Sequence, residues 1–200
     1  MLNPKKVSKD DKDYESKVEE KTPTATRHLI LIRHGQYNTD GERDKDRILT
    51  ELGRKQAEYV GQRLKDLNFP YTDFISSTMS RAVETAGIIH KFVPNLEWKQ
   101  CEMLCEGAPI PPEPPHGTWR PEKQQFFQDG ARIEAAFKKY FHRADPKQKT
   151  DSYEIFVCHA NVIRYFVCSL TWITIRPNGR VSLRMLGDSG FMPVDRLSLL

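Results

Sequence analysis

Short apolar runs recur along the chain and predict the strands of a sheet. Residues 29–32 are four consecutive aliphatic residues, two of them β-branched, which is typical of a short strand buried on both faces. Similar runs predict strands over residues 72–76, 96–105 and 152–158. Residues 172–176 and 180–186 alternate between apolar and polar positions on either side of a Pro-Asn-Gly turn, which predicts a hairpin.

Longer amphipathic stretches between these runs predict helices. Thr50 is expected to cap a helix over residues 51–67, whose apolar positions fall roughly on one face. Ser77 and the serine before it are expected to cap a second helix, with Arg81 in its first turn. Further helices are expected over residues 129–141 and from residue 162 to residue 167.

The first 26 residues differ in composition from the rest of the chain. They contain six lysines, six acidic residues and little that could be buried, so residues 1–26 are expected to be disordered ahead of one domain over residues 27–200. The net charge of +4 is mild and includes no basic run suited to nucleic acid, but it suits an anionic substrate. No apolar stretch is long enough to span a membrane, and the four cysteines form no metal-binding pattern.

Candidate chemistry follows the first predicted strand, where Arg33, His34 and Gly35 stand in succession. The carboxyl ends of central strands are where α/β proteins place their active sites. A histidine beside a permanent cation can attack a phosphoryl group while the arginine holds its oxygens, and a glycine allows an anion close to the backbone. Taken alone, the tripeptide is equally compatible with a solvated strand end.

Two other positions favour the functional interpretation. Arg81 follows a strand and opens a helix, where its guanidinium would add to the free N–H groups of the helix N-terminus. An isolated arginine on a helix is usually only solvated. His159, however, stands at the end of a predicted strand and the start of a helix, as His34 stands at the end of the first strand. Two strand-end histidines, an arginine beside one of them and an arginine at a helix start are the parts of a phosphoryl-transfer site.

Four motifs carry a family resemblance: RHG at residues 33–35, LTELGRKQA at 49–57, SSTMSRAVET at 76–85 and CHANVIR at 158–164. In this order and spacing the chain resembles the histidine phosphatase superfamily, in its phosphoglycerate mutase branch. The resemblance implies an α/β fold, a three-layer α/β/α sandwich with a mixed, mostly parallel sheet.

The resemblance also implies a role for each candidate residue. His34 would be the nucleophile that forms a phosphohistidine, and Arg33, Arg81 and His159 would hold the phosphoryl oxygens. Glu106 would protonate the leaving alkoxide and then activate water. No metal and no cofactor are expected, and the sequence shows no carboxylate cluster that would bind a metal.

Further stretches resemble the mitochondrial protein phosphatases of this branch: residues 106–110, 129–137, 142–145, 152–156 and 175–180. They imply a serine/threonine phosphatase at the mitochondrial outer membrane, a homo-oligomer, whose partners are phosphorylated proteins, a stress-signalling kinase among the candidates. No nucleic acid partner is expected. The chain itself is expected to be soluble, so a cytoplasmic location stays open beside the mitochondrial one that the resemblance implies. A small-molecule phosphatase or phosphoglycerate mutase-type enzyme, and a non-catalytic phosphate-binding module, stay open as alternatives.

The chain departs from the family pattern at three places. Gln36 and Asp40 stand where branch members usually carry Glu and Asn, and a carboxylate at residue 40 is expected to repel a substrate with several negative charges. Leu170 joins Thr171 directly, where relatives have a longer connection. This junction is expected either to unwind the end of the preceding helix or to keep the 172–186 hairpin from its usual position.

Overall fold

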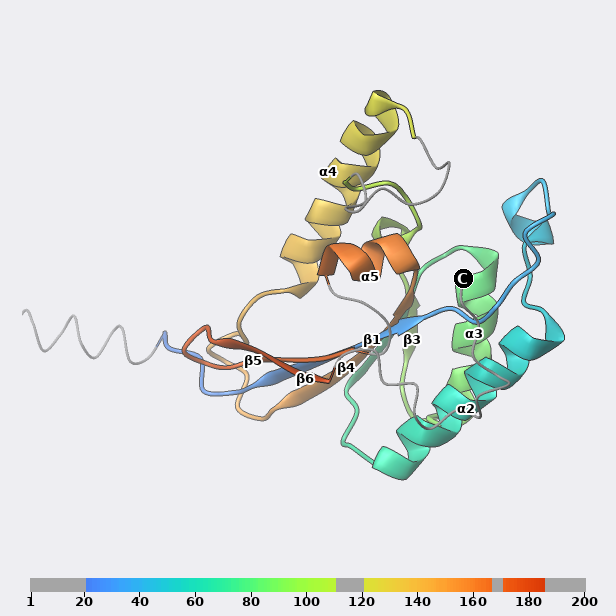
Figure 1. The fold of residues 1–200 in the computed structure, drawn as a ribbon. Coiled ribbons are helices and arrows are strands. Elements are labelled where there is room, and N and C mark those ends of the chain that lie inside the picture. Colours follow the sequence, from blue (N-terminus) through green and yellow to red (C-terminus); the bar gives the residue numbers. More distant parts are fainter. Residues whose placement is uncertain (1–20, 111–120, 167–170, 186–200) are drawn as a thin grey trace, which may run out of the picture.

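The computed structural model describes residues 21–110, 121–166 and 171–185 (Figure 1). Its centre is a six-stranded sheet in the order β3-β2-β4-β1-β5-β6. The strands are β1 (Arg27–Arg33), β2 (Asp73–Ser76), β3 (Trp98–Gln100), β4 (Ser152–Cys158), β5 (Thr171–Ile175) and β6 (Val181–Met185). Among them only β5 runs against the others, because it is antiparallel to both of its neighbours. The sheet is therefore mixed and mostly parallel, as predicted.

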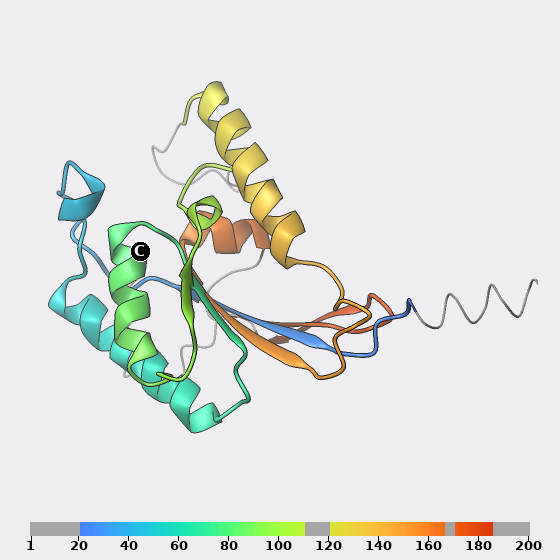
Figure 2. The same ribbon diagram turned by 180° about the vertical axis from the view of Figure 1, so that it is seen from behind.

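Helices cover both faces of this sheet. They are α2 (Glu51–Leu67), α3 (Ser80–His90), α4 (Lys123–Tyr140) and α5 (Ala160–Phe166), with short 3-10 turns η1 (Asp44–Asp46) and η2 (Glu102–Leu104). In both ribbon views α2 and α3 lie on one side of the sheet and α4 and α5 on the other (Figures 1 and 2). The predicted three-layer sandwich is confirmed. No helix within the described ranges combines the length and the apolar character needed to cross a membrane.

The alternating side chains of β1 supply both hydrophobic cores. Leu29 and Leu31 pack in the cluster that includes residues of α4 and α5, whereas Ile30 and Ile32 pack in the cluster that includes residues of α2 and α3. Successive side chains of a strand point to opposite faces, so a strand covered by helices on both sides must be apolar throughout. This explains the run of four aliphatic residues.

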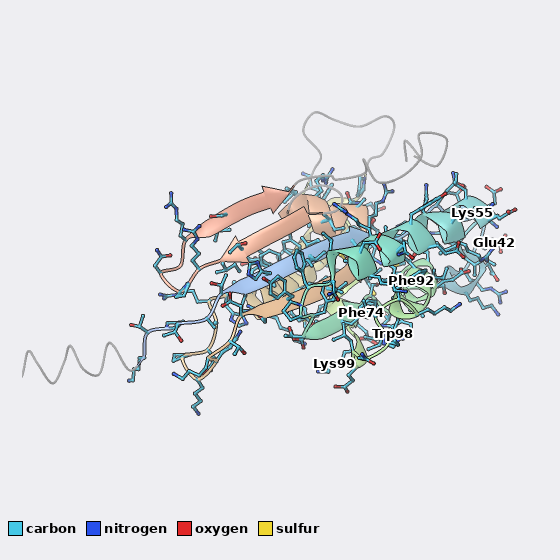
Figure 3. The ribbon with its side chains drawn as sticks, turned by 90° about the horizontal axis from the view of Figure 1, so that it is seen from below. Glu42, Lys55, Phe74, Phe92, Trp98 and Lys99 are labelled. Atoms are coloured by element: carbon cyan, nitrogen blue, oxygen red, sulfur yellow. The ribbon has the colours of Figure 1, made fainter. Side chains whose placement is uncertain are left out.

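The second of these cores continues toward the β3 edge of the sheet. The rings of Phe74 and Trp98 meet edge to face with centroids 6.2 Å apart. Phe92 follows α3 and lies against Gly61 of α2, where an added Cβ would come within 2.3 Å of its ring (Figure 3). The missing side chain at residue 61 thus lets an aromatic ring fill the space beside α2.

The predicted helix over residues 51–67 is confirmed, and it begins and ends at the predicted residues. The Thr50 hydroxyl oxygen accepts a hydrogen bond from the Gly53 amide at 3.1 Å, as an N-cap residue does. At the other end Asn68 adopts a left-handed conformation with φ of 47° and closes the helix. Strand β4 and the hairpin of β5 and β6 also lie where the sequence predicted them.

Three expectations about element boundaries were wrong. The strand expected over residues 96–105 is only β3, because it pairs on one side with the four-residue β2 and then turns into η2. Helix α4 begins at residue 123, ahead of the predicted start at 129, since exposed residues such as Phe127 gave the first turns no apolar stripe. The serines do not cap α3, whose N-cap residue Met79 makes no side-chain cap bond.

The hairpin after the short junction lies within the sheet. Helix α5 ends at Phe166, and β5 begins at Thr171 and pairs with β1 from Arg27 opposite Ile175 to Leu31 opposite Thr171. The hairpin is therefore part of the sheet and not a loose satellite of it. Residues 167–170 lie outside the described residues, as do the predicted disordered segment up to residue 20, the proline-rich stretch from residue 111 and the end of the chain from residue 186.

Two glycines bring the exit of β1 against the start of α2. A Cβ at Gly35 would lie 2.4 Å from the Gly53 carbonyl oxygen, and a Cβ at Gly53 would lie 1.9 Å from the Gln36 carbonyl oxygen. The close neighbour of Gly35 is therefore the backbone of α2, a contact that the sequence interpretation, which assigned this glycine to an approaching anion, did not anticipate.

Replacing two helical glycines by alanine should change the stability of the protein in opposite directions. Gly53→Ala should lower the free energy of unfolding by about 2 kcal/mol or more, because the clash is with backbone that cannot move cheaply. Gly87→Ala in α3 should raise it by about 0.5–1 kcal/mol, since its Cβ would meet Trp98 at an ordinary 3.6 Å. Urea unfolding of both variants measures the difference, and equal effects would contradict the account.

Candidate active site

His34 is the first residue after β1 and is almost completely buried. Its backbone amide donates to the Cys158 carbonyl oxygen at 3.0 Å, which continues the β1–β4 ladder by one residue. Its ring Nδ1 lies 2.8 Å from the Gly35 carbonyl oxygen. A carbonyl oxygen can only accept, so Nδ1 carries the proton and Nε2 presents a lone pair. The Nε of Arg81 donates to this Nε2 at 3.3 Å.

The surroundings keep the His34 imidazole neutral. Burial, with the positive charges of Arg81 and Arg33, lowers the pKa of His34 to about 3, and the Gly35 carbonyl opposes this shift. A neutral imidazole with an unprotonated Nε2 is the nucleophilic form of histidine. The His34 imidazole is therefore neutral at neutral pH, which is the protonation state that a histidine nucleophile requires.

Arg81 lies in the first turn of α3, as predicted, and only 3% of the residue is exposed. Its guanidinium carbon sits 4.7 Å from the centre of the Tyr37 ring, a cation–π contact. Thr85, one turn further along α3, donates to the Arg81 carbonyl oxygen at 2.7 Å and accepts from the Gly35 amide at 3.1 Å. This threonine ties the helix that carries the arginine to the strand exit that carries the histidine.

His159 occupies the corresponding place after β4. The β1–β4 register pairs Arg33 with Cys158, so the next residue of each strand is a histidine at the same sheet edge. The two imidazole centres are 5.1 Å apart. The Nε2 of His159 is hydrogen-bonded to the Ser77 hydroxyl at 2.8 Å, and burial, with the nearby His34 and arginines, lowers the pKa of His159 well below its usual value. Its Nδ1 has no hydrogen-bond partner among the described residues.

Glu106 follows η2 and joins the same site. Its Oε1 accepts hydrogen bonds from the amides of Gly107 at 3.1 Å and Asn161, at the start of α5, at 3.2 Å. Arg132 of α4 braces this turn by donating to the Cys105 and Glu106 carbonyl oxygens. Burial raises the pKa of Glu106, while these amides and the charges of Arg81 and Arg33 oppose the rise. A carboxyl group of this kind can serve as a proton donor.

Arg33 ends β1 and adds a second positive charge to the site. Burial lowers the pKa of the Arg33 guanidinium, and the carboxylate of Glu106 counteracts this effect. The Arg33 charge in turn acts on His34, His159 and Glu106. The charges of Arg33 and Arg81 therefore act on His34, His159 and Glu106, which brings the five residues that the sequence singled out into one site.

Three residues at the site were missed from the sequence: Tyr37, Asp44 and Ser77. Tyr37 stacks under Arg81 and meets His34 edge-on at 5.1 Å. Asp44 lies 3.5 Å from the Nη1 of Arg81, and Ser77, which was expected only to cap α3, bonds to His159. The only signal for them in the sequence is their position in the loops that follow β1 and β2.

The two departures from the family motif lie in different surroundings. The Gln36 Oε1 accepts from the Thr50 hydroxyl at 2.8 Å, and so this residue supports the start of α2. Asp40 is an exposed loop residue whose amide bonds to the Asn38 side chain. The carboxylate that reaches the arginine is that of Asp44, because the loop folds back through η1.

No group of three or more histidine, cysteine, aspartate or glutamate side chains suited to a metal ion occurs in the part of the chain that the structure describes. The charged and imidazole groups at the site are instead those of Arg33, Arg81, His34 and His159, with the partly buried carboxyl of Glu106 and the Asp44 carboxylate at the rim. This arrangement can bind a phosphoryl group, attack it at phosphorus and donate a proton to the leaving oxygen.

Comparison with known proteins identifies the class to which this fold and site belong. Residues 29–108 match the model of the histidine phosphatase superfamily (branch 1). A phosphoglycerate mutase of Plasmodium falciparum superimposes with a TM-score of 0.60 at 28% identity, covering 88% of this chain and all of that one. A phosphoglycerate mutase of Bacillus anthracis, at 19% identity, shares the fold with a TM-score of 0.65 over 85% of this chain and 96% of its own.

Sequence relatives narrow the class further. The rat mitochondrial serine/threonine-protein phosphatase PGAM5 is 50% identical over 99% of this chain and 76% of its own length. The human PGAM5 is 48% identical over 99% of this chain and 75% of its own. The chain belongs to the PGAM5 family of the histidine phosphatase superfamily.

The aligned length reveals an internal difference from these relatives. The alignment with the rat protein runs over 218 positions and this chain has 200 residues, so at least 18 positions (218 minus 200) must be residues that the relative has and this chain lacks. The existence of such a difference agrees with the shortened connection expected at Leu170 and Thr171, although the aligned length does not locate it.

The pKa of His34 predicts how stability depends on acid. Because this pKa is lower in the folded state, the unfolded chain takes up the proton first as pH falls below 6.5, and the free energy of unfolding decreases. From pH 7 to pH 5 the loss from this one residue is about 2 kcal/mol.

His34→Asn should remove this part of the acid sensitivity. Urea unfolding at pH 7 and pH 5 gives the loss for each protein, and the variant should lose about 2 kcal/mol less than the unchanged protein. His142→Asn is the control, because His142 is exposed. Equal losses in all three proteins would mean that His34 is not held neutral.

Proposed function

We propose that this chain removes phosphate from phosphoserine and phosphothreonine in proteins, with His34 as the nucleophile. The observation that carries the proposal is the unprotonated Nε2 of His34, fixed by the Gly35 carbonyl and facing Arg81. The names of the relatives support the substrate class, because each is named a serine/threonine-protein phosphatase and is 48–50% identical to this chain over the aligned 75–76% of its own length.

The reaction has two steps. The Nε2 lone pair of His34 attacks phosphorus, the bond to the serine or threonine oxygen breaks, and that oxygen takes the proton of Glu106. The Glu106 carboxylate then takes a proton from water, whose oxygen attacks the phosphohistidine and releases inorganic phosphate. The raised pKa of Glu106 suits the protonated starting form, and after phosphoryl transfer this residue is already the base.

The cationic groups stabilise the charge that develops on the phosphoryl oxygens. Arg33 and Arg81 supply two guanidinium groups, and Arg81 is held by Tyr37 and Thr85 before any substrate arrives. The Nδ1 of His159, without a partner among the described residues, is the atom on that ring left to contact a phosphoryl oxygen. Preorganised donors of this kind avoid reorganisation during the reaction.

We further infer that the chain acts at mitochondria, because the relatives are named as mitochondrial proteins. The finer expectation is the outer membrane, with phosphorylated proteins as partners and a homo-oligomer as the working form. Residues 27–200 would be the phosphatase domain. Fractionation of cells that express the tagged chain tests the location.

The proposed activity is tested with three substrates. The purified chain should release phosphate from a phosphoserine peptide and from p-nitrophenyl phosphate, and should not interconvert phosphoglycerates. His34→Asn should reduce release by several orders of magnitude while the protein stays folded. Isomerisation of 3-phosphoglycerate without peptide hydrolysis would favour the alternative of a mutase, the activity named for the Plasmodium protein whose structure is similar to this chain. No release and no phosphohistidine would favour a non-catalytic module.

Glu106→Gln should separate the two chemical roles of this carboxyl group. Glutamine can still accept from the Gly107 and Asn161 amides, so the local structure should be kept. Phosphoryl transfer from a phosphopeptide should slow about 10²- to 10⁴-fold for lack of a proton donor. Transfer from p-nitrophenyl phosphate should stay fast, because that leaving group needs no proton, and phosphoenzyme should accumulate.

Rapid-quench measurement of the first turnover gives these rates. Glu102→Gln is the control, since Glu102 lies in η2 four residues earlier and is exposed. An equal loss of first-turnover rate with both substrates would show that Glu106 positions another group and is not the proton donor.

A further inference from the structure

One oxygen of Asp44 anchors the loop that follows β1 to the start of α3. Its Oδ2 accepts from both the amide and the hydroxyl of Ser80, each at 2.8 Å. This bond satisfies an N–H group at the helix start that no serine of the preceding turn satisfies. In both ribbon views the loop that contains η1 stands beside the first turn of α3 (Figures 1 and 2). The anchor fixes where the rest of this carboxylate points.

The other oxygen of Asp44 faces Arg81. Its Oδ1 lies 3.5 Å from the Nη1 of Arg81, and within the described residues neither atom makes a hydrogen bond. The Arg81 side chain is 3% exposed, whereas that of Asp44 is 41% exposed. Asp44 Oδ1 is thus buried against the cation of the site, while other atoms of the Asp44 side chain reach solvent at the rim.

Two arginines of the same loop bind groups other than Asp44. Arg43 forms an ion pair with Asp46 at 3.0 Å, and Arg47 donates to the Gly41 carbonyl oxygen at 2.8 Å. The Asp44 charge beside Arg81 is thus not cancelled by these two neighbours.

A bound phosphate would lie within the range of this charge. A phosphoryl oxygen that accepts from the Nη1 of Arg81 at about 2.9 Å can be no further than about 6.4 Å from the Asp44 Oδ1, the sum of the two separations. This is shorter than the distance of about 8 Å over which physiological salt screens charges. A group next to the phosphate therefore approaches a negative charge at the rim.

We propose that Asp44 selects substrates by the charge that accompanies the phosphate: it favours a phosphorylated residue flanked by a cation and rejects one flanked by a second anion. The inference rests on the proposed phosphatase function and deepens it. The physical basis is that like charges at this separation repel, whereas a lysine or arginine of the substrate is attracted by the carboxylate charge of Asp44 at the rim.

Asp44→Asn tests the charge without removing the anchor, because the amide oxygen of asparagine can still accept from Ser80. Two phosphoserine peptides are compared that differ only in arginine or glutamate beside the phosphoserine. The unchanged protein should have the higher kcat/KM for the arginine peptide. In Asp44→Asn the ratio of the two values should fall about three- to tenfold, mainly through KM.

Asp46→Asn is the matched control, since it removes the same charge from the same turn at a residue paired with Arg43. It should leave the ratio unchanged. The proposal is overturned if Asp44→Asn slows both peptides equally, which would indicate a purely structural role, or if Asp46→Asn lowers the ratio as much. Hydrolysis of neither peptide by the unchanged protein would instead count against the phosphatase function, whereas equal hydrolysis of both would count against the role of Asp44 alone.

Discussion

The hydrogen bond from His34 Nδ1 to the Gly35 carbonyl oxygen determines the chemistry of the whole site. It is 2.8 Å long and leaves the lone pair on Nε2, the nitrogen that faces Arg81. Without it the proton could sit on Nε2, and the attack on a phosphoryl group that we propose for His34 could not take place. The fold therefore has to hold one carbonyl, one imidazole and one guanidinium in a fixed relation.

Backbone contacts around β1 supply this rigidity. The parallel register with β4 sets His34 beside His159. The absence of side chains at Gly35 and Gly53 allows the end of β1 to lie directly against the start of α2. At the other end of β1, Arg27 forms a buried bidentate pair with Glu154 of β4. The two strands are thus joined by an ion pair at one end and by the site at the other. Because the imidazoles of His34 and His159 are buried in the neutral form, the site lowers the free energy of unfolding in acid.

The sequence predicts the parts of this arrangement whose signals are local. Each of three features can be recognised from a few neighbouring residues: the apolar run of β1, the Thr50 cap of α2 and the turn that contains Gly179. The residues that complete the site do not, because Asp44 and Tyr37 reach Arg81 only after the loop after β1 folds back. Asp40 is the residue that departs from the family motif, but the carboxylate that contacts Arg81 is that of Asp44.

Nitrogen NMR of the histidines tests the central claim most directly. In protein labelled with ¹⁵N at histidine, the His34 resonances, assigned by their loss in His34→Asn, are followed from pH 8 to pH 4.5. The account predicts a protonated Nδ1 and an unprotonated Nε2 throughout, since the pKa of His34 lies at about 3. An Nε2-protonated ring at pH 7, or titration of His34 near pH 6.5, would contradict it.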